Sequence, residues 1–321
     1  MRFVVTGAGG FLGSTLVREL LATTDHEVVA VSSQGPAEMK ELLERPPFPP
    51  LSRTPHVHAR EELLQEGFLR SGDVVVNCAF PWNRGGTAMA QGLEYLTRLF
   101  KAAASVDLHS FVNVSSQSVY SQARTEPAAE DSPIECDTPY STGKYAMELA
   151  AALVLNPQVL VNARMSSLIG VGYDVRIVNR FITKFLAGDT VTIQGGEQTF
   201  DFMDVRDAAQ ALITVAVAGP RPEGPALNIG SNNPLTLKEI AQTVADVVRA
   251  ETGHPAEISW EASAGDDRTL GLDSGLLRRE YDFVPRHSLE DSALNILQAM
   301  TAPRLAAVRE TPTDPVEGGR R

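Results

Sequence analysis

A glycine-rich turn between a strand and a helix constrains this fold more than any other feature of the sequence. Residues 2–6 (RFVVT) are a short β-branched run typical of a buried strand, and Gly7-Ala-Gly-Gly10-Phe-Leu-Gly13 follows at once. Helically spaced apolar residues begin at Leu12. Gly7 permits a tight turn, Gly10 lets the backbone approach a pyrophosphate, and Gly13 allows close packing of helix on strand. The N-terminus of that helix favours an anion.

Further apolar runs predict that this strand belongs to a larger sheet. They alternate with helical patterns and lie at residues 27–31, 73–79, 109–116 and 158–164. Strands that are apolar along their whole length are typical of a parallel sheet covered on both faces. We therefore predict an α/β fold with a doubly wound parallel (Rossmann) sheet.

The latter part of the chain predicts a smaller α/β domain. Residues 200–217 should form a strand that runs into a helix, and residues 226–232 a strand that ends in a turn. The spacing of Thr236 and Glu239 indicates a capping box for a helix that extends through Val248. We predict that residues 1–163 and 201–228 form a nucleotide-binding Rossmann domain. Residues 164–200 and 229–300 should form a mainly C-terminal substrate-binding domain, and residues 301–321 a flexible tail.

Composition and charge exclude several classes of function. The formal net charge of −12 opposes binding to a nucleic acid polymer. The N-terminal residues contain neither a long apolar signal region nor a membrane span, and two cysteines, Cys78 and Cys136, suit a reducing cytoplasm. His56 and His58 have no third ligand nearby, so we predict no metal site.

A tyrosine and a lysine are the strongest candidates for chemistry. Tyr140 and Lys144 are four residues apart, so they share one face of a helix. A phenol has a pKa near 10, and a nearby ammonium and an oxidised nicotinamide would both lower it. Lowering that pKa by three pH units needs about 4 kcal/mol. Ser115 and Ser116 end the run 109–116, where ligands bind in doubly wound sheets, and either hydroxyl could hold a substrate oxygen.

Taken together, these motifs resemble the extended short-chain dehydrogenases/reductases of the NAD-dependent epimerase/dehydratase family. The resemblance covers about residues 2–300. It rests on TGAGGFLG (6–13), VNVSSQSVY (112–120), Tyr140 with Lys144, Arg164 in NARMSSLIG, FDFMDVRDAA (200–209) and LNIGSNNPLTLKEIA (227–241). It implies a Rossmann fold and bound NAD(P) acting on sugar nucleotides or related carbonyl compounds.

The resemblance also implies roles for individual residues. Ser116 matches the catalytic serine of the family, with Ser115 as the alternative. Tyr140 matches the acid–base tyrosine of the family, and Lys144 matches its lysine. The residues expected to contact the cofactor are Gly7, Gly10, Phe11, Leu12, Gly13, Ser32, Ser33, Ala79, Tyr140 and Lys144.

The residues after the second predicted strand bear on the choice of cofactor. Ser32-Ser33-Gln34 contains no carboxylate to repel a 2′-phosphate, although no arginine follows either. We therefore favour NADP over NAD.

Departures from the family pattern restrict the reaction and the substrate. Gln117 and Ser118 stand where 4,6-dehydratases of the family carry an Asp-Glu pair, so water elimination is disfavoured. The arginines expected to bind a diphosphate are missing before Asp201 and in residues 261–267. The residues that we expect to contact substrate instead are Ser116, Gln117, Arg84, Ser167, Asn179 and Arg180.

Three functions follow from these residues. The first is a ketoreductase, in which NAD(P)H delivers hydride to a keto group and Tyr140 donates the proton. The second is an epimerase with transient oxidation and no net use of cofactor, and the third is a cofactor-binding protein without turnover. We expect a sugar nucleotide as the small-molecule partner and a homodimer formed through the helix that carries residues 147–153.

Overall fold

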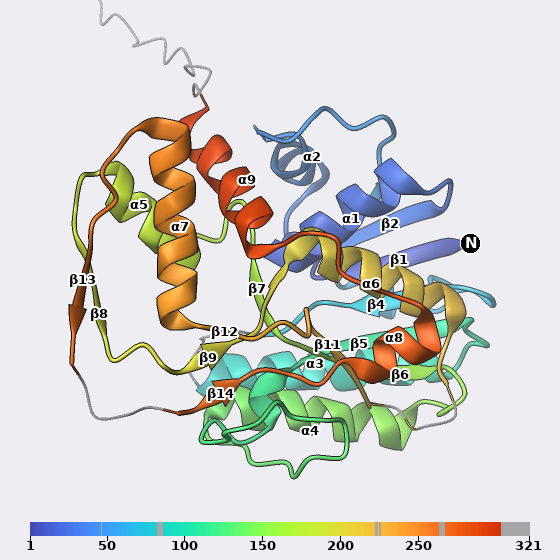
Figure 1. The fold of residues 1–321 in the computed structure, drawn as a ribbon. Helices are drawn as coiled ribbons and strands as arrows, with labels where there is room; N and C mark the ends of the chain where they lie inside the picture. The colour runs from blue at the N-terminus through green and yellow to red at the C-terminus, as the bar shows by residue number, and fades with distance from the viewer. Residues whose placement is uncertain (46, 82–85, 222–223, 225, 263–266, 303–321) are drawn as a thin grey trace, which may run out of the picture.

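A seven-stranded parallel sheet forms the centre of the larger lobe. The computed structural model describes residues 1–45, 47–81, 86–221, 224, 226–262 and 267–302 (Figure 1). The strand order is β11-β6-β5-β4-β1-β2-β3, and every pair of neighbours is parallel. The strands are β1 (Arg2–Thr6), β2 (Glu27–Ser32), β3 (His56–Ala59), β4 (Val74–Asn77), β5 (Ser110–Ser116), β6 (Leu160–Met165) and β11 (Ala226–Ile229). The predicted doubly wound parallel sheet is confirmed.

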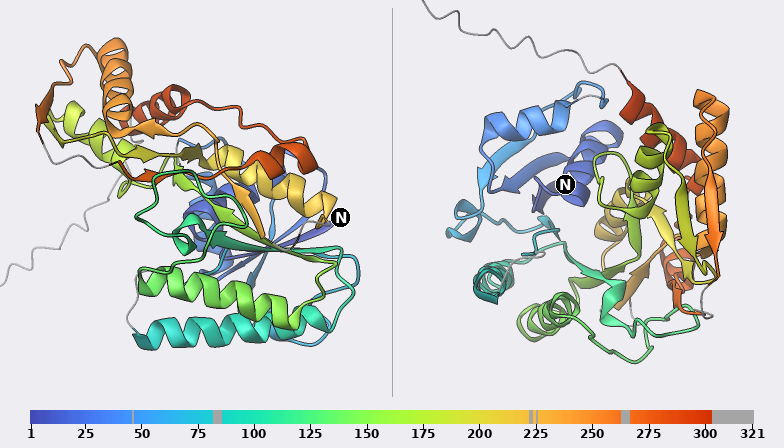
Figure 2. Two further views of the ribbon diagram at one scale, coloured as in Figure 1. Left: turned by 60° about the horizontal axis from the view of Figure 1, so that its bottom comes forward. Right: turned by 90° about the vertical axis from the view of Figure 1, so that its left-hand side faces the viewer.

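Helices cover both faces of this sheet, as the views in Figure 2 show. Alternate residues of β1 reach opposite faces: Phe3 and Val5 join one apolar core, and Val4 joins the other. The first face carries α1 (Phe11–Thr23), α2 (Pro36–Glu44), α6 (Val205–Ala218) and α8 (Gly275–Tyr281). The second face carries α3 (Gly86–Ala104) and α4 (Pro139–Val154), which lie side by side.

The smaller lobe has its own apolar core. Side chains of α5 (Ile177–Leu186), α7 (Leu237–Thr252) and α9 (Leu289–Thr301) form this core with β8 (Val191–Gln194). The remaining short strands are β7 (Ser167–Ile169), β9 (Thr199–Phe200), β10 (Phe202–Asp204), β12 (Leu235–Thr236), β13 (Ile258–Glu261) and β14 (Thr269–Leu270).

The predicted boundaries differ from the structure in two places. The capping box of Thr236 and Glu239 is present, but α7 runs four residues beyond Val248, to Thr252. Gly253 caps the helix in a left-handed conformation, which glycine adopts without strain. Helix α8 lies within the range 229–300 that we assigned to the substrate domain, yet it packs on the sheet, because its buried side chains belong to the core beneath α6. Residues 303–321 of the predicted tail lie outside the described residues.

Among the described residues, no helix is both long and apolar enough to cross a membrane. The same part of the chain contains no group of three or more His, Cys, Asp or Glu side chains placed to hold a metal ion.

Candidate active site

The glycine loop joins β1 to α1 and needs glycine at two positions. Gly7 has a φ of +66°, and a Cβ there would lie 2.7 Å from the backbone nitrogen of Ala79. A Cβ on Gly13 would lie 2.2 Å from the carbonyl oxygen of Gly7, which is far inside van der Waals contact. The helix begins at Phe11, directly after Gly10, so its free N–H groups belong to this loop. This geometry brings the positive end of α1 to the carboxyl edge of the sheet.

A cavity of about 780 Å³ lies beside the glycine loop. This volume falls within the range typical of cofactor and ligand sites. Its walls include five of the residues that we predicted for the cofactor, namely Gly7, Gly10, Ser32, Ser33 and Ala79. Other residues of this wall were not predicted, among them Gly9, Gln34, Arg60 and Phe80. Phe11, Leu12 and Gly13 form the first turn of α1 behind the loop rather than the cavity wall.

The end of β2 is polar and carries no carboxylate. The Ser32 hydroxyl accepts a hydrogen bond of 3.0 Å from the backbone N–H of Gln34. A smaller cavity of about 460 Å³ adjoins here and shares Ser32, Ser33, Gln34, Arg60 and Glu61 with the larger one. Although no arginine follows β2 in sequence, the end of β3 brings Arg60 to the same edge, because β2 and β3 are parallel neighbours. The Arg60 side chain is 58% exposed, and its Nε pairs with Glu61 at 2.6 Å.

Tyr140 lies in the first turn of α4, close to the end of β5. Thr138 caps this helix through a capping box with Ser141, which fixes where the helix begins. Burial raises the pKa of the Tyr140 phenol above its ordinary value, and a hydrogen bond with the Ser116 side chain opposes that change. The Ser116 hydroxyl also accepts bonds from the N–H and the hydroxyl of Ser118, at 3.2 and 3.0 Å. The hydroxyl groups of Ser116 and Tyr140 are therefore neighbours at the end of β5.

The lysine of the predicted pair lies one helical turn further on and is almost fully buried. Its Nζ donates a 2.8 Å hydrogen bond to the carbonyl oxygen of Val114 and lies 4.3 Å from the centre of the Phe80 ring. Burial lowers the pKa of Lys144 to about 8. The Phe80 ring also packs edge-on against Tyr140, so this side chain connects the cavity with both candidate catalytic groups.

One electrostatic expectation is not met in the protein alone. We predicted that the Lys144 ammonium lowers the pKa of Tyr140, but that pKa is raised. The reason is that burial of the phenol outweighs the bond from Ser116, while Lys144 is held by Val114 and lies 6.0 Å from the centre of the Tyr140 ring.

The two neighbouring serines have different environments, which bears on the register of the serine motif. Ser115 is buried, and its hydroxyl donates to Oε1 of Glu148 on the inner face of α4. Glu148 also pairs with Arg164 of β6 at 2.8 Å, and Arg164 donates to the Tyr120 hydroxyl at 2.8 Å. Ser115 thus belongs to a buried network that holds α4 against the sheet, whereas Ser116 faces Tyr140. Sequence reasoning missed Glu148, although it lies four residues after Lys144 and therefore on the same helix face.

Two of the predicted substrate residues lie together beside Ser116. The Gln117 amide nitrogen donates to the Ser167 hydroxyl at 2.9 Å, and its oxygen accepts from Arg124 at 3.1 Å. An amide is neither an acid nor a base near neutral pH, so Gln117 can orient its neighbours but cannot transfer a proton.

The other predicted substrate residues are not brought to this point. Asn179 is fully buried, with its amide nitrogen donating to the carbonyl oxygen of Gly170 at 3.1 Å, while its Oδ1 has no hydrogen-bond partner among the described residues. Arg180 is exposed on α5, and Arg84 lies outside the described residues.

A different arginine lies near the candidate catalytic tyrosine. Arg176 precedes α5, and its guanidinium stacks on Tyr173 at 5.0 Å, while its positive charge lowers the pKa of Tyr140. The Arg176 Nε is buried and has no hydrogen-bond partner among the described residues. Tyr173 in turn stacks on Phe11 at 4.4 Å. In the sequence, the one indication of this role for Arg176 was that it lies three residues before Asn179, which we had predicted to contact substrate.

The fold and this site together define a nicotinamide-nucleotide enzyme of the extended short-chain dehydrogenase/reductase type. The model of the NAD dependent epimerase/dehydratase family matches residues 3–230. The chain therefore belongs to that family.

Relatives of known activity cover almost the whole chain. The UDP-glucose 4-epimerase of Mycolicibacterium smegmatis is 29% identical over 310 residues, which is 91% of this chain and 96% of that protein. A dTDP-4-dehydro-6-deoxy-D-allose reductase from a Streptomyces species is 26% identical over 326 residues, 90% of this chain and 94% of that protein. The solved UDP-glucuronic acid 4-epimerase of Bacillus cereus in complex with NAD superposes with a TM-score of 0.73 at 21% identity, covering 93% of this chain and 97% of that one.

Proposed function

We propose that this protein is an NADPH-dependent ketoreductase that acts on a sugar nucleotide or a related carbonyl compound. The observation that carries the proposal is the pairing of Ser116 with Tyr140 next to the cofactor cavity, without a carboxylic acid at either position 117 or position 118. Such a site can move one proton at one carbon–oxygen bond, but it lacks the second acid–base group that water elimination needs.

In this mechanism, each side chain acts on the carbonyl oxygen of the substrate, on the Tyr140 phenol or on an anionic group of the substrate. A cofactor held in the cavity lined by Gly7, Gly10 and Ser32 would supply the hydride for the carbonyl carbon. The Ser116 hydroxyl donates a hydrogen bond to the carbonyl oxygen, and Tyr140 gives that oxygen its proton, so the products are an alcohol and NADP⁺. The Ser116 hydroxyl and the charge of Arg176 favour the phenolate that remains until solvent returns the proton, and we expect the Lys144 ammonium, 6.0 Å from the centre of the Tyr140 ring, to add to that effect when the bound ligands exclude water. Arg176, with its unpaired Nε, would hold an anionic group of the substrate close to Tyr140.

The polar end of β2 supports NADP over NAD. A carboxylate that would repel a 2′-phosphate is missing at Ser32 and Ser33, and we expect the exposed Arg60, which pairs with Glu61 in the protein alone, to turn to a 2′-phosphate. Exchanging Arg60 for glutamate should weaken binding of NADP by about tenfold or more while changing binding of NAD far less. Equal losses for both cofactors, measured by calorimetry, would argue against this assignment.

An epimerase is the second candidate, because a UDP-glucose 4-epimerase is among the relatives and the same three residues suffice for its chemistry. Cofactor stoichiometry separates the two functions. A ketoreductase consumes one NADPH per turnover, whereas an epimerase retains its cofactor and turns over without any added. Mass spectrometry of the small molecules that copurify with the protein, followed by an NADPH-consumption assay, decides between them.

Replacing the tyrosine tests whether the protein is an enzyme at all. Tyr140→Phe should lower kcat/KM by about 10²–10⁴-fold with cofactor affinity retained, because only the proton donor is lost. Tyr145→Phe, one turn further along α4, is the matched control and should keep its activity. A fully active Tyr140→Phe variant would instead support a cofactor-binding protein without this chemistry.

The outer face of α4 supports a homodimer. Leu149 and Leu153 are one helical turn apart and are 49% and 87% exposed, respectively, beside the neighbouring helix α3. We propose that this face meets its copy across a two-fold axis. Leu153→Glu should then halve the mass measured by light scattering, and an unchanged mass would contradict the assignment.

The two cysteines are unpaired, which supports a cytoplasmic location.

A further inference from the structure

The two candidate catalytic residues of α4 share one face of that helix with a third ionisable residue, Glu148. Tyr140, Lys144 and Glu148 follow one another at intervals of four residues, so their side chains lie in one row along the helix. Lys144 and Glu148 are both buried, each with 4% of its surface exposed. The proposed reaction uses the first two residues of this row and gives no task to the third.

The ammonium of Lys144 and the carboxylate of Glu148 contact consecutive residues of the same strand, β5. The Lys144 Nζ donates to the carbonyl oxygen of Val114 at 2.8 Å, and Oε1 of Glu148 accepts a hydrogen bond from the Ser115 hydroxyl. Positions one helical turn apart have their Cβ atoms about 6 Å from each other. The two charges are therefore neighbours, and water screens them little because both side chains are buried.

A buried ammonium needs a nearby anion to keep its charge. Burial lowers the pKa of Lys144 to about 8, and the neighbouring Cys78 and Glu148 act in the opposite direction. Cys78 carries no negative charge near neutral pH, because burial raises the pKa of its thiol to about 12. Glu148 is therefore the neighbour whose charge favours the ammonium.

Glu148 also pairs with Arg164, but this arginine is shared. Arg164 donates to both carboxylate oxygens of Glu148, at distances between 2.8 and 3.2 Å. The same guanidinium donates to the Tyr120 hydroxyl and to the backbone carbonyl of Glu130, and its charge also favours ionisation of the Glu130 carboxyl. Two carboxyl groups thus face one guanidinium, and Lys144 is the second cation of this buried network.

The other titratable groups that face this network come from several elements of the larger lobe. Burial raises the pKa of each of them, so that none becomes charged near neutral pH. They are Cys78 after β4, Cys136 before α4, Tyr120 after β5 and Tyr140 on α4. Lys144 is therefore the group of this cluster that we expect to exchange its proton close to pH 8.

We propose that Glu148 is a positioning residue for the reaction, whose carboxylate keeps Lys144 charged beside Val114 so that the ammonium can act on the Tyr140 phenolate. The inference rests on the proposed reaction for its catalytic meaning. The charge of Lys144 itself is measured without turnover, which separates the two.

The test follows the titration of Lys144 by NMR. The full-length protein, free of substrate, is prepared with lysine labelled with ¹³C at Cε, whose signal reports whether the amine is protonated. Lys144→Met identifies the signal of Lys144 by its loss. In the wild type we expect a midpoint near pH 8, and Glu148→Gln should lower it by about one pH unit, because Arg164 then faces Lys144 without an anion between them.

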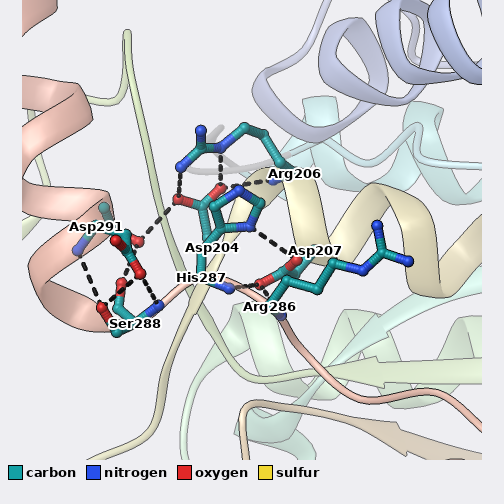
Figure 3. Close-up of polar contacts among 8 residues, drawn as sticks. Asp204, Arg206, Asp207, Arg286, His287, Ser288 and Asp291 are labelled. Carbon is teal, nitrogen blue, oxygen red and sulfur yellow. Dashed lines mark hydrogen bonds and ion pairs between the residues drawn. The ribbon is translucent and has the colours of Figure 1, made fainter.

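Asp204→Asn is the matched control. Asp204, like Glu148, is a buried carboxylate that pairs with an arginine at 2.8 Å, in this case Arg206. This pair lies at the junction of α6 and α9, where Ser292 donates to the same carboxylate at 2.8 Å (Figure 3). Because α6 covers the opposite face of the sheet from α4, breaking this pair should destabilise the protein but leave the midpoint of Lys144 unchanged.

A double variant covers the case in which Glu148→Gln does not fold, since removing one member of a buried ion pair leaves the other charge unpaired. Glu148→Leu combined with Arg164→Met replaces both charges by apolar side chains, and it should also lower the midpoint of Lys144 because the anion is lost.

An unchanged midpoint in Glu148→Gln, or in the double variant if only that one folds, would overturn the inference. An equal decrease in Asp204→Asn would overturn it as well. In the active enzyme, the pH above which kcat/KM falls should decrease in Glu148→Gln by the same amount as the midpoint. A lowered midpoint supports the role of Glu148 even if NADPH consumption is not found, and an unchanged midpoint refutes that role even in an active reductase.

Discussion

Replacing Lys144 by methionine should make this protein more stable and, at the same time, inactive. In the folded protein, burial lowers the pKa of Lys144 from 10.5 to about 8. At 1.36 kcal/mol per pH unit, this difference corresponds to about 3 kcal/mol against folding at pH 7, where the side chain is charged. The unfolded chain binds more protons between pH 8 and 10.5, so the stability of the wild type should rise with pH across that window.

Lys144→Met removes the buried charge but keeps most of the packing volume. The lost hydrogen bond to Val114 offsets about 1 kcal/mol of the gain, which leaves a net stabilisation of about 2 kcal/mol at pH 7. The free energy of unfolding is measured by urea denaturation at pH 7 and pH 10. Lys101→Met, at an exposed position of α3, is the control and should change stability by less than about 0.5 kcal/mol. The reasoning is refuted if Lys144→Met is no more stable than the wild type at pH 7, or if its advantage does not shrink at pH 10.

Three other predictions follow from the site. Because Lys144 loses its proton near pH 8 while burial keeps Tyr140 protonated, kcat/KM for reduction should be level below pH 8 and fall above it; a level profile to pH 10 would contradict this. Ser116→Ala should lower kcat/KM by about 10²-fold, whereas the neighbouring Ser115→Ala should mainly cost stability, about 1–3 kcal/mol, as steady-state kinetics and denaturation can show. Gly13→Ala should weaken cofactor binding and cost at least about 2 kcal/mol, with Gly86→Ala, which has open space around its Cβ position, as a neutral control in the same assays.

The sequence alone determined those helices, strands and turns whose residues follow a regular spacing along the chain. Alternating apolar strands and amphipathic helices predict the parallel sheet, because each strand is buried on both faces and each helix on one. The glycine spacing 7-10-13 also carries its structural reason in the sequence, since a turn this tight excludes a Cβ at Gly7 and Gly13. The four-residue spacing of Tyr140 and Lys144 likewise follows from the helical period.

What the sequence did not determine is which side chains meet across distant segments. Arg60 and Ser32 belong to different strands, and only the parallel pairing of β2 and β3 brings them to one cavity. Arg176 reaches Tyr140 because the smaller lobe folds back over the end of the sheet, and no local period encodes that approach.

The choice between the two serines after Val114, Ser115 and Ser116, is another point that the sequence alone could not decide. Both stand at the end of β5, and the sequence left either of them as the partner of Tyr140. The pleat of the strand points successive side chains to opposite faces, so only one of the two serines can face α4, and Ser115 is the one that donates to Glu148. Ser116 can still meet Tyr140 because Tyr140 lies in the first turn of α4, close to the end of β5. Only the packing of α4 against that strand decided that Ser116 is the one beside the phenol.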